Sequence, residues 1–268
     1  MTLVLRYAAR SDVGLIREGN EDSGYAGPAL LLVADGMGGH AAGELASAIA
    51  VATVADLDVH PPGRADVLSA LGQSIGEVGE RIADVIEGEP DLTGMGTTVT
   101  GLYWLGDRVA VVHVGDSRAY LLRDGALTQL THDHTYVQTL VDAGRITEAE
   151  ATIHPRRSLL MRALDGMNTV EADLSVREAR DGDRYMLCTD GLSGVVDAAT
   201  IETVLIEGGD PTGAVTRLVE LALENGAPDN VTVVVADVVD VPAPAPDVPA
   251  VDEPYAPVVV RSEEHTSE

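Results

Sequence analysis

Four aspartates stand where apolar stretches of the chain begin or end. Asp35 follows LLLVA, Asp116 follows VAVVHVG, Asp190 follows RYMLCT, and Asp229 shortly precedes VTVVV. If these stretches are strands of antiparallel sheets, all four carboxylates can lie at the same sheet edge. Clustered carboxylates repel one another and raise their own pKa values unless cations neutralise them. Since neither further cysteines nor an HExxH pair of histidines accompanies them, their oxygens favour Mg²⁺ or Mn²⁺ over zinc.

Asp35 also opens the glycine-rich segment DGMGGHAAG. Glycine lacks a Cβ and adopts positive φ, so Gly36, Gly38 and Gly39 would let main-chain carbonyls or amides approach a ligand. Asp-Gly is equally typical of a plain strand-to-helix turn, and for any one of the four acids a turn or a cap is the better interpretation. Their recurrence at strand ends favours a joint metal site.

The predicted chemistry of such a site is the transfer of a phosphoryl group to water. Two ions that share a bridging carboxylate can hold a hydroxide in line with a phosphorus atom and neutralise the phosphoryl oxygens. Arg17 is the candidate for binding the phosphate, because a planar guanidinium matches two phosphate oxygens. Glu21 and Asp22 follow in the same polar segment and could accept hydrogen bonds from metal-bound waters.

The elements that must position these residues are predicted to form one α+β domain. Strands are expected at 2–10, 97–105, 108–114, 118–125, 170–179, 184–188 and 231–239, and helices at 44–57, 65–87 and 212–225. Residues 132–165 show no clear strand and are expected to form an insertion packed on the main body. Antiparallel strand groups with clustered helices favour an architecture in which helices cover sheet faces.

The composition limits where the protein is expected to be located and which kinds of partner it can bind. With 268 residues, 45% of them hydrophobic, the chain can bury one substantial core. Its formal charge of −27 would repel nucleic acids and anionic membranes. The sequence shows no run of about 20 apolar residues and no secretory signal, which makes the cytoplasm the expected location. The single cysteine, Cys188, lies in an apolar run and is expected to be a buried small hydrophobe.

Seven motifs resemble those of the metal-dependent protein serine/threonine phosphatases of type 2C (PPM) in their bacterial form. They are Arg17 with NEDS at 20–23, VADGMGGHAAGE at 33–44, GMGTTV at 94–99, HVGDSRAY at 113–120, LTHDH at 130–134, LCTDGL at 187–192 and APDNVTVVV at 227–235. Their number and order make the match specific for residues 6–239. The resemblance implies an α/β/β/α sandwich of two antiparallel sheets, helices on both outer faces, and a binuclear metal centre at one end.

The resemblance also implies a role for each site residue. Asp35 would bridge two Mn²⁺ or Mg²⁺ ions, and the carbonyl of Gly36 would bind the second ion. Asp190 and Asp229 would complete the protein ligands of the first ion. The bridging hydroxide would attack the phosphorus of phosphoserine or phosphothreonine directly, so Cys188 and the serines would form no phosphoenzyme.

A third ion and a mobile flap are further features that the resemblance implies. Bacterial members often hold a third ion, for which Asp116 and Asp190 would be ligands and Ser158 a weaker candidate. Residues 136–160 correspond to the flap beside the active site. This correspondence agrees with the insertion expected from the sequence pattern.

The identity of the general acid stays open. Relatives from higher organisms carry a histidine two residues after the bridging aspartate, whereas this chain has Met37 there and His40 three positions later. His40 is the candidate general acid, with metal-bound water as the alternative. His113 lies in an apolar strand and is expected to be a satisfied core residue, while His132 and His134 fit either loop surface or flap support.

Two other functions stay open at this point. A non-catalytic pseudophosphatase or sensor of the same fold would have a broken metal set, and a metal-dependent nuclease is disfavoured by the acidic charge. For an active phosphatase, the resemblance implies phosphoprotein substrates, a signalling role that opposes serine/threonine kinases, and these kinases as partners. The catalytic domain is expected to be monomeric.

The chain is expected to divide into three parts. Residues 1–240 form the catalytic domain, 241–260 an extended proline-rich linker, and 261–268 a segment that resembles the translation of a sequencing adapter. We hypothesise that this last segment is not biological; without its one arginine and three glutamates the formal charge changes from −27 to −25. Some bacterial relatives continue from such a linker into a membrane anchor, so the natural chain is expected to be longer.

Overall fold

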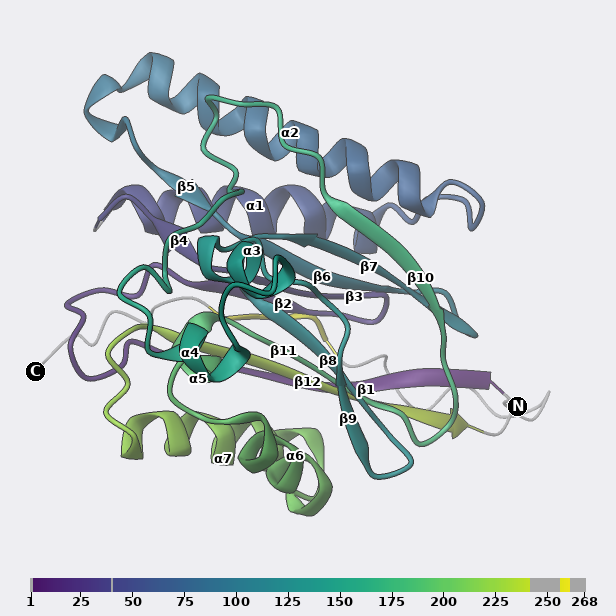
Figure 1. Cartoon of the computed structure of the whole chain (residues 1–268). Coiled ribbons are helices and arrows are strands. Elements are labelled where there is room, and N and C mark those ends of the chain that lie inside the picture. Colours follow the sequence, from purple (N-terminus) through teal and green to yellow (C-terminus); the bar gives the residue numbers. More distant parts are fainter. Residues whose placement is uncertain (1, 40, 242–255, 261–268) are drawn as a thin grey trace, which may run out of the picture.

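The computed structural model describes residues 2–39, 41–241 and 256–260. Two antiparallel sheets pack face to face, and helices cover the outer face of each sheet (Figure 1). The predicted α/β/β/α sandwich is therefore confirmed.

The six-stranded sheet has the strand order β10-β7-β6-β3-β2-β13. Its strands are β2 (Ser23–Ala26), β3 (Leu30–Ala34), β6 (Val99–Trp104), β7 (Arg108–Val114), β10 (Asp173–Glu178) and β13 (Val258–Val260). Its outer face is covered by α1 (Ala41–Val59) and α2 (Val67–Gly88), and a 3₁₀ turn (Pro90–Leu92) follows. In α2 the side chains of Leu71, Ile75 and Val78 are buried, because their spacing of three or four residues places them on one face.

The five-stranded sheet has the order β1-β12-β11-β8-β9. Its strands are β1 (Thr2–Asp12), β8 (Arg118–Arg123), β9 (Ala126–Gln129), β11 (Arg184–Cys188) and β12 (Val231–Val241), and its outer face is covered by α6 (Ala198–Glu207) and α7 (Pro211–Glu224). The side chain of Asp210 caps α7 by accepting from the amide of Gly213. Between the sheets, apolar side chains such as Leu31 and Val234 form the central core.

Several elements were not predicted from the sequence. Strands β2 and β9 and helix α6 were missed, and the segment around Gly36 forms a short strand, β4 (Gly36–Met37), paired with β5 (Gly96–Thr97). The linker prediction is wrong at 258–260, because three consecutive β-branched valines favour a strand and pair with the edge of β2. Residues 242–255 of the predicted linker and the segment 261–268 lie outside the described residues.

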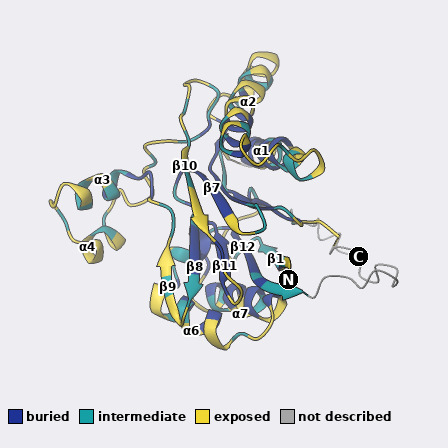
Figure 2. Ribbon diagram, turned by 90° about the vertical axis from the view of Figure 1, so that its right-hand side faces the viewer, coloured by how far each residue is buried: buried dark blue, intermediate teal, exposed yellow. Residues whose placement is uncertain are grey.

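The predicted insertion holds two short helices, α3 (Tyr136–Asp142) and α4 (Glu148–Thr152), which stand away from the sheets (Figure 2). The two ends of the insertion lie side by side and form a neck, which is closed by two backbone hydrogen bonds. The amide of Tyr136 donates to the carbonyl of Leu159 at 2.8 Å, and the amide of Met161 donates to the carbonyl of His134 at 2.7 Å. The flap is therefore held at its base and exposed along most of its length.

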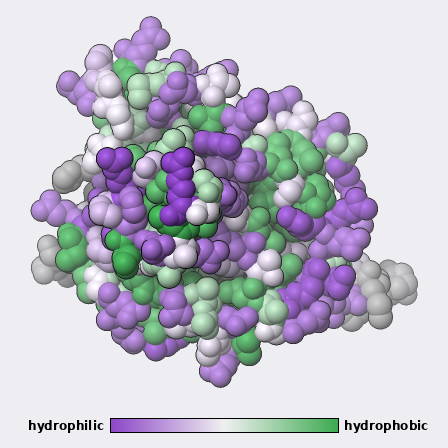
Figure 3. Space-filling model, in the orientation of Figure 1, coloured by the Kyte–Doolittle hydropathy of each residue, from purple (hydrophilic) through white to green (hydrophobic). Residues whose placement is uncertain are grey.

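The surface is strongly polar. Hydrophilic side chains gather over most of the face seen in Figure 1, with apolar groups between them (Figure 3). Among the described residues, no helix combines the length and the apolar character needed to span a bilayer.

Candidate metal centre

The four predicted aspartates lie at strand ends that meet at one end of the sandwich. Asp35 follows β3 and Asp116 follows β7, and these strands run in the same direction because each pairs antiparallel with β6. Asp190 begins the short helix α5 (Asp190–Ser193) after β11, whereas Asp229 precedes β12, the antiparallel partner of β11. The carboxyl ends of three strands thus meet the amino end of the fourth.

The carboxyl groups influence one another electrostatically. Lost hydration is the main cause that raises the pKa of Asp35 well above its ordinary value, and the charges of Asp22, Asp190, Asp116 and Asp229 raise it further. For the same leading reason the pKa of Asp190 is raised, and those of Asp22 and Asp116 are raised to about 7. Negative charge is therefore concentrated where little water can stabilise it.

One oxygen of this cluster has no hydrogen-bond partner among the described residues. It is the buried Oδ1 atom of Asp190. An orphaned carboxylate oxygen is costly, and a divalent cation would satisfy it. No group of three or more His, Cys, Asp or Glu side chains in the described part of the chain is arranged as a ready-made metal site. The fit to Mg²⁺ or Mn²⁺ therefore rests on the all-oxygen donor set and on this orphaned atom.

Close backbone packing brings the Asp190 and Asp229 loops together. A Cβ on Gly191 would lie only 1.8 Å from the carbonyl oxygen of Asn230. The side chain of Asn230 in turn accepts from the amide of Glu21 at 2.8 Å and donates to the carbonyl of Gly19 at 2.9 Å. Asn230 thereby ties the segment that carries Arg17, Glu21 and Asp22 to the start of β12.

Thr98 joins Asp35 to the Asp116 loop. Its hydroxyl accepts from the amide of Asp35 at 3.0 Å, and its amide donates to the Asp35 carbonyl at 2.9 Å. The same hydroxyl lies 2.9 Å from that of Ser117. Gly115 has a φ of +112°, and a Cβ there would lie 2.5 Å from a Thr98 side-chain carbon, so only glycine fits before Asp116.

Arg17 lies at the rim of the cluster. Its guanidinium donates to Oδ2 of Asp229 at 2.7 Å, and 47% of the Arg17 side chain stays exposed. The hydrogen bond to Asp229 is the main cause that raises the pKa of Arg17, and the charges of Glu21 and Asp35 contribute. A fixed and accessible guanidinium beside these acids suits the binding of a phosphate group.

Gly36, Glu21 and Asp22 lie around Asp35. A Cβ on Gly36 would lie 2.1 Å from the carbonyl oxygen of Gly43, so this part of the glycine-rich segment packs directly on the start of α1. The carboxylate of Glu21 lies against Gly43, and Asp22 is buried and accepts from the hydroxyl of Thr189 at 2.8 Å. His40 lies outside the described residues.

Ser158 shares a cavity with two of the aspartates. Asp116, Asp190 and Ser158 all line a cavity of about 420 Å³ between the flap and the main body. The cavity also receives Arg118 and Arg157. The three residues named for a third ion therefore face one common space.

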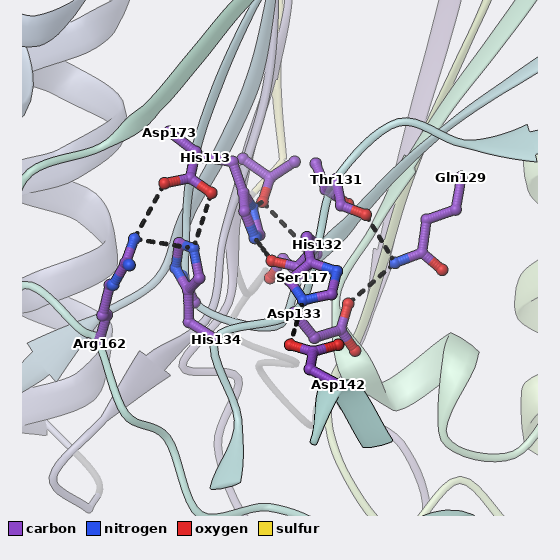
Figure 4. Close-up of polar contacts among 12 residues, drawn as sticks. His113, Ser117, Gln129, Thr131, His132, Asp133, His134, Asp142, Arg162 and Asp173 are labelled. Carbon is purple, nitrogen blue, oxygen red and sulfur yellow. Dashed lines mark hydrogen bonds and ion pairs between the residues drawn. The ribbon is translucent and has the colours of Figure 1, made fainter. Parts of the chain in front are cut away.

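The histidines have separate roles (Figure 4). His113 is buried; its Nδ1 lies 2.9 Å from the Thr100 hydroxyl and its Nε2 lies 3.0 Å from the His132 carbonyl. Its burial and the partners of both ring nitrogens confirm the predicted core role, and burial lowers the pKa of His113 to about 4. His132 is exposed and pairs with Asp142, whereas His134 is buried at the neck of the flap. The sequence left two roles open for these histidines. His132 therefore fits the loop surface, and His134 fits the support of the flap.

Sequence reasoning missed the supporting residues Thr98, Thr189 and Asn230. Each lies within a quoted motif, in GMGTTV, LCTDGL and APDNVTVVV, and Thr189 and Asn230 stand directly beside an acid. That adjacency was the available signal for these two, whereas Thr98 has no acidic neighbour in the sequence. The adjacency does not reveal the partners, because every one of them comes from another part of the chain.

Comparison with known proteins gives matches along most of the chain. The sequence profile of the family described as Protein phosphatase 2C matches residues 20–221. The serine/threonine protein phosphatase PstP of Mycobacterium tuberculosis is 59% identical over 240 residues, which are 90% of this chain and 46% of that protein. This chain therefore spans about half the length of that relative.

Other matches cover their counterparts almost completely. The serine/threonine phosphatase stp of Listeria welshimeri is 36% identical over 236 residues, which are 85% of this chain and 94% of that protein. A solved catalytic domain of PstP in complex with two manganese ions superposes with a TM-score of 0.84 at 57% identity, covering 89% of this chain and 100% of that chain. These matches confirm the resemblance carried by the motifs, and the chain belongs to the bacterial branch of the protein phosphatase 2C (PPM) family.

Proposed function

We propose that this chain is a metal-dependent phosphatase that hydrolyses phosphoserine and phosphothreonine in proteins. The observation that carries the proposal is the gathering of aspartates from both sheets at one end of the sandwich, with Arg17 at its rim. Family membership and the serine/threonine phosphatase activity in the names of the relatives support it.

Mn²⁺ or Mg²⁺ would be held by the acidic cluster. Asp35, the carbonyl of Gly36, Asp190 and Asp229 are the proposed ligands of two ions, in keeping with the two manganese ions of the solved relative. Asp116, Asp190 and Ser158 are the proposed ligands of a third. When bound, such ions activate a water molecule as nucleophile and neutralise the phosphoryl oxygens.

The side chains of the chain itself bind and orient the substrate. The exposed part of the Arg17 guanidinium would hold two phosphate oxygens while Asp229 fixes its position. Cys188 is unsuited to nucleophilic attack, because it is fully buried and burial raises its thiol pKa to about 12. Glu21 and Asp22 would orient water, and His40 is the proposed proton donor to the leaving serine or threonine oxygen.

The wider setting is also a proposal. Phosphoproteins would be the substrates, and serine/threonine kinases would be among the partners that this enzyme opposes in signalling. The catalytic domain, proposed to span residues 1–240 with a flap at 136–160, would act as a monomer on the cytoplasmic side. Neither nucleic acid nor a membrane surface suits the formal charge of −27.

Hydrolysis of an aryl phosphate tests the activity. Turnover is expected with added Mn²⁺, and it should be nearly abolished by Asp35→Asn. Asp84→Asn on the exposed side of α2 serves as the matched control and should keep full activity. Phosphoserine and phosphothreonine peptides then test the substrate class against phosphotyrosine peptides. The proposal fails if the parent shows no turnover or if Asp35→Asn leaves turnover unchanged, and the pseudophosphatase would then be the better interpretation.

A further inference from the structure

The edge of the six-stranded sheet at β2 is covered by a segment from beyond β12. Strand β13 pairs antiparallel with β2, and Val258, Val259 and Val260 lie opposite Ala26, Tyr25 and Gly24. Residues 242–255, which lie outside the described part of the chain, separate this segment from β12. A segment remote from the sandwich in sequence therefore completes one of its sheets.

The contact involves side chains as well as backbone. A Cβ on Gly24 would lie 2.8 Å from a methyl group of Val260 and 3.0 Å from the methyl group of Thr232 in the opposite sheet. Gly24 thus leaves a notch between the two sheets, and the Val260 side chain fills it. Val259 points the other way, since side chains alternate along a strand, and it is 50% exposed.

Strand β2 has the properties of a site that accepts an added strand. An uncovered edge strand presents unpaired amide and carbonyl groups, and peptides recognise such edges through main-chain hydrogen bonds with pockets for alternate side chains. All four residues of β2 are buried beneath the pairing and the surrounding elements. The notch over Gly24 supplies a pocket that suits a β-branched side chain at one position only.

The direction of β13 links the contact to the acidic cluster. Because the pairing is antiparallel, β13 runs from the level of Ala26 towards that of Gly24, and Ser23 directly follows Asp22. The hydroxyl of Ser23 lies 2.9 Å from that of Ser47 on α1. A strand that braces β2 thereby also braces the segment leading to Glu21 and Asp22.

We propose that the edge of β2 is a docking site for a β-branched strand and that its occupant is the chain's own segment 256–260. Docking in cis fastens the region beyond β12 to the sandwich and steadies the segment that carries Glu21 and Asp22. The proposal rests on strand pairing and packing alone and is independent of catalysis.

Hydrogen exchange of the full chain tests the docking, with a matched pair of variants. Val260→Asp places a charge in the notch, whereas Val259→Asp places the same charge on the exposed face of the same strand. The amides of Gly24 and Ala26 face β13, because alternate amides of β2 face β3 in the register in which Gly27 donates to Leu30. They are expected to exchange at least about tenfold faster in Val260→Asp than in the parent, and to keep parental rates in Val259→Asp. Unchanged exchange in the centre of β12 would show that the domain stays folded.

Thermolysin digestion gives a second measurement, since this protease cuts before valine. Both variants keep two of the three valines, so the number of sites at 258–260 is matched. Cleavage within 258–260, identified by mass, should be rapid for Val260→Asp and slow for both the parent and Val259→Asp. Parental exchange and parental cleavage in Val260→Asp would overturn the proposal, and equal loss of protection in both variants would overturn the role of the notch.

Discussion

His134 and Gly115 are joined by two hydrogen bonds. The amide of His134 donates to the carbonyl of Gly115 at 2.7 Å, and the amide of Gly115 donates to Nδ1 of His134 at 3.1 Å. Because Nδ1 accepts, the ring proton lies on Nε2, which donates to Asp173 at 3.1 Å. Arg162 donates to the other oxygen of Asp173 at 2.9 Å (Figure 4). His134 therefore connects the loop before Asp116 with the base of the flap.

Replacing His134 should destabilise this junction. His134→Leu has a side chain of similar size but leaves the buried amide of Gly115 without its acceptor, at an expected cost of about 1–3 kcal/mol in the free energy of unfolding. Urea unfolding measures the change. His132→Leu is the control, because His132 is exposed and its removal should change stability by less than about 0.5 kcal/mol. Equal stabilities of the two variants would contradict the role assigned to His134.

Arg17→Lys should weaken phosphate binding although the charge is kept. A lysine ammonium cannot hold two phosphate oxygens and Asp229 with one planar group. We expect kcat/KM for an aryl phosphate to fall by about 10- to 100-fold, which corresponds to about 1.4–2.7 kcal/mol. Arg81→Lys on α2 is the control, since Arg81 is exposed and pairs with Glu77 on the same helix face. A parental kcat/KM in Arg17→Lys would remove Arg17 from the site.

The acidic cluster should make the metal-free protein less stable as pH rises. The pKa of Asp22 is raised to about 7, chiefly by burial, against about 3.9 in an unfolded chain. The folded state therefore holds the proton more tightly, and stability should fall between about pH 4 and pH 7, by up to about 1.4 kcal/mol per pH unit for this group. Urea unfolding in EDTA from pH 4 to 8 measures the slope.

Substitution of Asp22 measures how much this residue contributes to the pH dependence of stability. In Asp22→Asn the side chain can still accept from Thr189 but carries no charge. The stability of the metal-free protein should therefore fall less as pH rises, and it should exceed that of the parent at pH 8. Asp84→Asn, exposed on α2, should leave the slope unchanged. Added Mn²⁺ should reduce the slope in the parent, because bound cations favour the ionised carboxylates. A metal-free stability that increases from pH 5 to pH 8 would refute the assigned direction.

The helices and strands that depend on the local pattern of residues were predicted well from the sequence. The stripe of α2 and the runs of β7, β11 and β12 are set by the spacing and type of neighbouring residues, and antiparallel pairing then brings the four aspartates to one end. Strand β2 was missed because SGYA is short and has no apolar alternation. It is a strand only because β3 and β13 pair with it.

Contacts between distant segments could not be predicted in the same way. Thr98 accepts from Asp35, 63 residues away, and Asn230 accepts from Glu21, 209 residues away. Nothing in the local sequence of a threonine or an asparagine specifies such a partner, which is set by tertiary packing. That the four aspartates gather at one end of the sandwich was therefore predictable, whereas the residues that position them were not.

Gly191→Ala should separate Asp190 from Asp229 without removing either carboxylate. A Cβ there would lie 1.8 Å from the carbonyl oxygen of Asn230, so the two loops must move apart, at an expected cost of about 1–3 kcal/mol in the free energy of unfolding. The Mn²⁺ concentration for half-maximal activity should rise. Gly79→Ala in α2 is the control: beyond the adjacent backbone of its own helix, no atom of the described residues lies within 4 Å of the new Cβ, and alanine should stabilise the helix by up to about 1 kcal/mol. Parental stability and parental Mn²⁺ dependence in Gly191→Ala would show that close contact of these loops does not set the spacing of the two aspartates.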